Sequence, residues 1–123
     1  MSKDKEFLDA FLKLKTELDD TVYKLEDVVI NGNLEEKIAA LKEAEESLPP
    51  ALERFDTLPE PEAENVKNAR DSYKKAMHLY QQACSHYVKL LTEQNREEGK
   101  EGAYKMKQAG DLFVKASEYL EGK

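Results

Sequence analysis

Hydrophobic residues recur every three or four positions over most of this chain, which is the spacing that lines one face of an α-helix. The first such pattern covers residues 4–30 and ends at Asn31-Gly32-Asn33, where Gly32 can adopt the left-handed conformation that closes a helix. Asn33 precedes Glu36 by three positions, the spacing of a capping box at the start of a second helix. Because the turn between the two patterns is so short, we predict that the two helices lie antiparallel.

The second pattern, residues 34–48, is followed by two consecutive prolines. Pro49 disfavours helical geometry in the residue before it, so we predict that this helix ends at Leu48. A short helix over residues 51–56 follows, before the segment Pro59-Glu60-Pro61. We interpret residues 49–61 as a kinked continuation that closes one end of the fold.

The third and fourth patterns alternate small and large residues on a repeat of seven positions. In the third they are Ala69, Ala76 and Ala83 with Tyr73, Tyr80 and Tyr87; in the fourth, Ala109 and Ala116 with Met106, Phe113 and Leu120. Such a repeat allows a partner helix to approach closely at each alanine while a large side chain fills the adjacent space. These two segments are therefore predicted to form an antiparallel hairpin.

The connection between them covers residues 93–102, where the apolar stripe disappears and two glycines lower the helix propensity. We predict a turn near Gly99 to Gly102; the alternative is one continuous helix to residue 120, which would need a dimer to cover its far end. The predicted fold is all-α, an antiparallel up-down-up-down four-helix bundle with a short kinked helix after the second helix. A single domain over residues 1–123 is expected.

Composition and charge narrow the range of partners. Charged residues make up 37% of the chain and the net charge is −7, so its surface repels phosphate backbones and anionic lipid headgroups. No apolar run approaches the length of about 18 residues that a spanning helix needs. We therefore expect neither nucleic-acid binding nor membrane insertion.

The charge is unevenly distributed along the chain: acidic residues dominate residues 1–64, and basic residues slightly outnumber acidic ones in residues 65–123. Either the two halves attract each other within the fold, or the acidic half faces a basic partner.

The single cysteine, Cys84, cannot form an intramolecular disulfide, which suits a reducing compartment. A soluble, cytoplasmic protein is expected, although an exported protein without its leader would have the same sequence.

Catalytic, metal-binding and cofactor-binding patterns are missing from the sequence. Neither His78 nor His86 has the glutamate three positions earlier that di-metal bundles use. Cys84 and His86 lie about 200° apart around one helix and cannot form a nucleophile–base pair. Glycine-rich phosphate loops are lacking too. We expect no catalytic residues, no metal and no cofactor, hence no enzyme activity.

Two sets of apolar or aromatic residues are not required for the core of a four-helix bundle. Leu12, Tyr23 and Ile30 form a second row beside the main stripe of the first helix, and we predict an interface with a protein partner or with a second copy in a homodimer. Tyr73, Tyr80 and Tyr87 could form the wall of a pocket between the third and fourth helices. The main hypothesis is a non-catalytic helical bundle acting through protein–protein contacts; the alternative is a bundle that binds a small apolar or aromatic ligand in that pocket.

Overall fold

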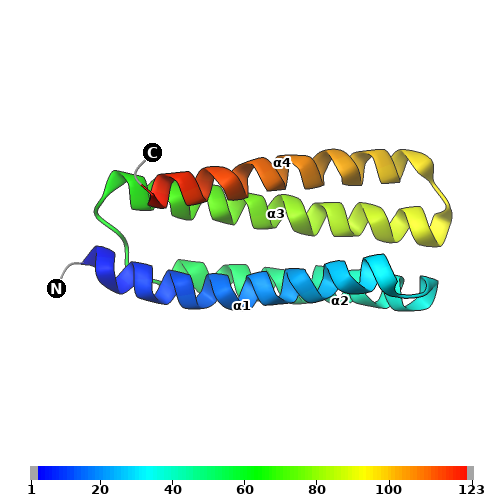
Figure 1. Cartoon of the computed structure of the whole chain (residues 1–123), viewed down its shortest axis with the longest axis horizontal. Helices are drawn as coiled ribbons and strands as arrows, with labels where there is room; N and C mark the ends of the chain where they lie inside the picture. The colour runs from blue at the N-terminus through cyan, green and yellow to red at the C-terminus, as the bar shows by residue number, and fades with distance from the viewer. Residues whose placement is uncertain (1–2, 122–123) are drawn as a thin grey trace.

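The computed structural model describes residues 3–121 and shows two antiparallel helical hairpins side by side (Figure 1). The elements are α1 (Lys3–Asn31), α2 (Leu34–Glu53), the 3₁₀ helix η1 (Arg54–Thr57), α3 (Glu64–Glu93) and α4 (Arg96–Leu120). Within the described residues there is no β-strand. The all-α bundle with a short helix after the second long one is thus confirmed.

The turn between α1 and α2 contains the predicted capping box. The Asn33 side chain accepts a hydrogen bond from the Glu36 backbone N–H at 2.9 Å, and the Glu36 carboxylate accepts one from the Asn33 N–H at 3.1 Å. Gly32, however, is not left-handed: its N–H donates to the Val28 carbonyl at 2.7 Å, as in a continuing helix. Glycine is suited here because an added Cβ would lie 2.6 Å from that carbonyl oxygen.

The predicted end of the second helix at Leu48 is wrong, because α2 continues through Pro49 and Pro50 to Glu53. A proline inside a helix leaves the carbonyl four residues earlier without its hydrogen bond. For Pro49 that carbonyl belongs to Glu45, and the Gln81 amide of α3 donates to it at 3.4 Å. Burial of one continuous face also favours the extended helix; that face carries Leu48, Leu52 and, on η1, Phe55.

The core is centred on a cluster of aromatic rings around Tyr73 of α3. Its ring centroid lies 5.4 Å from that of Phe11, 5.6 Å from that of Phe55 and 5.4 Å from that of Phe113. These distances are typical of favourable edge-to-face or tilted ring pairs. Because the four rings come from α1, η1, α3 and α4, this cluster joins all the main parts of the bundle except α2.

The hairpin of α3 and α4 is the most closely packed pair of helices in the structure. Its seam consists of small, fully buried residues: Ala69, Ala76 and Ala83 on α3, and Gly102, Ala109 and Ala116 on α4. The predicted hairpin with a close approach at the alanines is therefore confirmed.

The turn of this hairpin, however, is not near Gly99 to Gly102. It lies at Gln94, which adopts the left-handed conformation (φ 55°, ψ 37°), and Asn95, whose side chain caps α4 by accepting from the Glu97 N–H at 3.1 Å. Gly99 and Gly102 belong to α4. Gly102 serves packing, since a Cβ there would lie 3.1 Å from Cε1 of Tyr87. The alternative of one continuous helix is also wrong.

Candidate functional site

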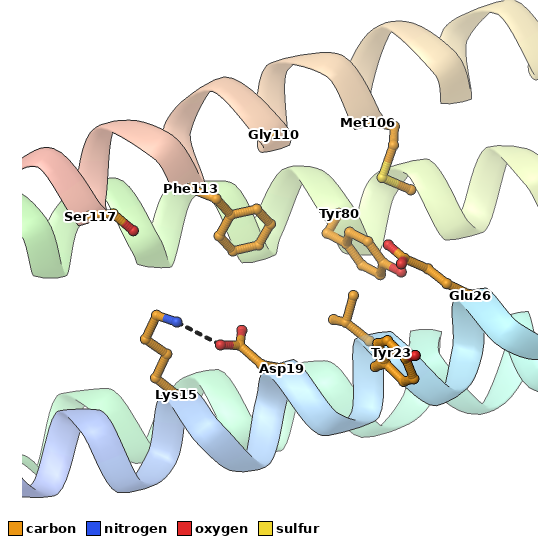
Figure 2. A pocket seen from close by; sticks show the side chains of 10 residues that line it. Lys15, Asp19, Tyr23, Glu26, Tyr80, Met106, Gly110, Phe113 and Ser117 are labelled. Carbon is orange, nitrogen blue, oxygen red and sulfur yellow. Dashed lines mark hydrogen bonds and ion pairs between the residues drawn. The ribbon is translucent and has the colours of Figure 1, made fainter.

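A groove of about 420 Å³ separates α1 from α4, and the side chain of Tyr80 extends into it from α3 (Figure 2). We call it the α1–α4 groove. It is lined by Lys15, Asp19, Val22, Tyr23 and Glu26 of α1, by Tyr80 of α3, and by Met106, Gly110, Phe113 and Ser117 of α4. It exists because α4 packs closely on α3 while α1 packs on α2 and α3, so that α1 and α4 make few direct contacts.

Most of the lining forms one line of residues along each of the two helices, with Tyr23 beside the line on α1. On α1 the line is Lys15, Asp19, Val22 and Glu26; on α4 it is Met106, Gly110, Phe113 and Ser117. Both lines have the spacing i, i+4, i+7, i+11, which keeps side chains on one face of an α-helix. At 1.5 Å per residue the groove is about 16 Å long, or about three helical turns.

One end of the groove is held by hydrogen bonds between charged and polar groups. Lys15 Nζ lies 2.6 Å from Asp19 Oδ2, and the Tyr73 hydroxyl donates to Asp19 Oδ1 at 3.1 Å. Lys15 also lies 5.9 Å from the centroid of the Tyr73 ring. The charges of Lys15 and Asp19 therefore satisfy each other.

The opposite end carries polar groups without such partners. Tyr80 is only 3% exposed, yet its hydroxyl makes no hydrogen bond to any residue in the 3–121 range. No enclosed side-chain nitrogen or oxygen in the described part of the chain lacks a partner, so this hydroxyl must open into the groove. Burial, with smaller contributions from Cys84 and then from the Glu26 carboxylate, raises the pKa of Tyr80, so the group remains a neutral hydrogen-bond donor.

Glu26 differs from the other charged residues of the lining. Unlike Lys15 and Asp19, it forms no ion pair or hydrogen bond with the residues that the structure describes. In Figure 2 its carboxylate extends toward Tyr80 and Met106. This end of the groove therefore combines an unpaired carboxylate, a hydroxyl and apolar side chains.

One residue of the predicted interface row of α1, Tyr23, lies on the rim of this groove. Tyr23 lines it and is 75% exposed, while Leu12 and Ile30 are 48% and 75% exposed. Leu12 precedes Tyr23 by about three helical turns and Ile30 follows it by about two, so the three side chains share one face of α1. The row thus extends the α1 wall beyond both ends of the groove.

The predicted pocket-wall tyrosines lie in three different environments. Tyr80 lines the α1–α4 groove, Tyr73 is buried in the aromatic cluster, and Tyr87 packs against Gly102 in the α3–α4 seam. Of the six residues singled out from the sequence, the structure brings Tyr23 and Tyr80 together in one groove. The groove lies between α1 and α4, not between α3 and α4 as predicted for the pocket.

Sequence reasoning missed the contribution of α4 and of Glu26. Met106 and Phe113 were assigned to the hairpin seam, but both also face the groove. The sequence feature that points to the groove is the presence of two small residues, Gly110 and Ser117, on this line of α4. A helix face that packs fully against a neighbour would carry larger side chains at such positions.

The thiol of Cys84 and the two histidines lie apart from the groove. Cys84 is fully buried in the core, and this burial raises the pKa of its thiol to about 12. His86 Nδ1 lies 2.6 Å from Glu98 Oε2, joining α3 to α4, and His78 is exposed. Across residues 3–121, no group of three His, Cys, Asp or Glu side chains is placed to hold a metal ion.

None of the helices over residues 3–121 is long and apolar enough to cross a membrane. The chain matches no protein-family model, no curated protein and no solved structure.

Proposed function

We propose that this chain is a non-catalytic helical protein that acts by binding another protein, and that the α1–α4 groove is its contact surface. The observation that carries the proposal is the uncovered apolar lining: Tyr23 is 75% exposed at the rim, and Val22, Met106 and Phe113 line the groove beside it. Exposed apolar side chains gathered around a concave surface are typical of sites where proteins bind one another. A cytoplasmic location belongs to the same proposal, in keeping with the single cysteine.

Gly110 offers a way to close the groove without disturbing the core. A Cβ added there would meet no atom within 4 Å, so larger side chains can extend into the open space. Gly110→Trp should fill the groove, and Gly110→Ala is its matched control because it makes the same backbone change and leaves the groove open.

The test places a photo-crosslinking amino acid at position 23 on the rim or at the exposed position 75 on α3, in cells that make the protein. We expect a discrete adduct from position 23 that Gly110→Trp abolishes and Gly110→Ala retains. The same adduct from position 75, or an adduct that Gly110→Trp leaves unchanged, would refute the groove as the contact surface. An adduct of twice the chain mass would identify a second copy as the partner.

A second candidate is a small apolar or aromatic ligand bound in the same groove. The Tyr80 hydroxyl favours it, since ligand sites combine apolar walls with a few polar groups, and a volume of about 420 Å³ lies in their usual range. Native mass spectrometry of the gently purified chain distinguishes this candidate: extra mass that Gly110→Trp removes would favour a small ligand over a protein.

A further inference from the structure

The shape of the α1–α4 groove matches one face of a helix. Two lines of four residues, each with the spacing i, i+4, i+7, i+11, border a space of about three helical turns, and Gly110 leaves it open on the α4 side. A helix laid in such a groove would present apolar side chains at the same spacing, the usual pattern of helix-in-groove recognition.

The charges of the groove select the chemistry of that helix. Lys15 and Asp19 already pair with each other, so the charge left to a partner is the carboxylate of Glu26. The ring of Tyr80 is buried, and its hydroxyl, which has no hydrogen-bond partner within the described residues, opens into the groove beside that carboxylate. A carboxylate next to apolar and aromatic walls is complementary to a lysine or arginine whose aliphatic stem packs on those walls.

We infer that the groove binds an amphipathic partner helix with one basic side chain that pairs with Glu26 beside the Tyr80 hydroxyl. This inference rests on the proposed function and adds the chemistry of the partner. The net charge of −7, concentrated in residues 1–64, attracts a basic helix over longer distances. The same charge opposes a second copy laid with its acidic α1 against this one.

The experiment selects helices from a displayed library. The library is an 18-residue amphipathic helix with apolar residues fixed at i, i+4, i+7 and i+11 and randomised flanking positions. It is selected separately on the full chain, on Glu26→Lys and on Glu101→Lys. Glu101 is exposed on α4 and does not line the groove, so Glu101→Lys changes the net charge equally and serves as the control.

We expect the wild-type chain and Glu101→Lys to select lysine or arginine at one flanking position, and Glu26→Lys to select aspartate or glutamate there. The best wild-type peptide should bind about tenfold more tightly than the same peptide with glutamine at that position, as one charge-assisted pair predicts. In Glu26→Gln the two peptides should bind equally. A basic preference unchanged in Glu26→Lys would overturn the inference.

Gly110→Trp separates failure of this inference from failure of the proposed function. Peptides that bind the wild-type chain and not Gly110→Trp, but show no charge preference, would leave the groove as a contact surface and refute the basic helix. No peptide enriched on the wild-type chain over Gly110→Trp would refute both. A doubled mass of the wild-type chain, lost in Gly110→Trp, would show that a second copy fills the groove and would also overturn the inference.

Discussion

Alanine substitution at Gly102 and at Gly110 should change the stability of this protein in opposite directions. Both glycines lie inside α4. Replacing a glycine in a helix interior by alanine favours folding by about 1 kcal/mol, because glycine loses more backbone entropy. Both variants therefore gain the same backbone contribution to stability. Any difference between their free energies of unfolding must come from the atoms that surround each new Cβ.

Those surroundings differ sharply. At Gly110 the new Cβ meets nothing within 4 Å, so the free energy of unfolding should rise by the full amount of about 1 kcal/mol. At Gly102 it would lie 3.1 Å from Cε1 of Tyr87 and 3.3 Å from Cβ of His86. The His86 Cβ is fixed to the backbone of α3, so the two helices must move apart. Overpacking costs about 1–3 kcal/mol, and Gly102→Ala should therefore lower the free energy of unfolding by about 1 kcal/mol net.

Urea denaturation followed by circular dichroism at 222 nm measures both variants against the wild-type chain. The m-values of the two variants should be equal. Their free energies of unfolding, each obtained as the m-value times the midpoint concentration of urea, should differ by about 2 kcal/mol. Equal stabilisation by Gly102→Ala and Gly110→Ala would refute the close packing of α3 on α4 at Gly102. It would also remove the physical reason for a glycine at that position.

Three further predictions follow from groups inside the bundle. Since burial raises the pKa of Cys84 to about 12, the native thiol should resist alkylation by iodoacetamide at pH 8 and react once urea unfolds the chain; equal rates would contradict its burial. Tyr73→Phe removes the hydroxyl that donates to Asp19 and should cost about 1 kcal/mol in urea denaturation, whereas an unchanged midpoint would show that this bond contributes nothing. The hydrogen bond from His86 lowers the pKa of Glu98 below 4.5, so the stability from this contact is present above that pH and is lost as the pH falls through the lowered pKa. The urea midpoint of His86→Ala should thus fall less between about pH 5 and pH 3 than that of the wild-type chain, and parallel curves would contradict the pairing.

The sequence predicted those parts of the fold that depend on neighbouring residues or on a strict repeat. The capping box at Asn33 and Glu36 is a local pattern, and the seven-residue interval of alanines specified the α3–α4 hairpin. The continuation of α2 through Pro49 could not be read in the same way, because the Gln81 amide that satisfies the freed carbonyl belongs to another helix. The position of the turn at Gln94 does not follow from the glycines, because Gly102 is required by the close packing of α4 on α3 and not by a turn.

The candidate site was predicted only in fragments. Tyr23 and Tyr80 were singled out for separate reasons, one as part of an interface row and the other as part of a pocket wall. Their shared groove depends on the distance between α1 and α4, which no periodicity within a single helix reports. The role that we propose for Glu26 likewise depends on its surroundings, since Lys15 and Asp19 pair with each other and leave the Glu26 carboxylate unpaired within the described residues.

The close packing of α3 and α4 also explains why the groove is open. Helices joined through Gly102, Ala109 and Ala116 approach more closely than helices joined through leucines or phenylalanines, so the seam holds α4 near α3. On α1 the core-facing residues are large and hold that helix farther from its neighbours, as Phe11 does against Tyr73. Because α4 is held close to α3, it does not also cover α1, and the apolar side chains of Val22, Met106 and Phe113 on the facing sides of α1 and α4 stay only partly buried. The small-residue repeat that makes the α3–α4 hairpin therefore also creates the surface through which we propose that the protein acts.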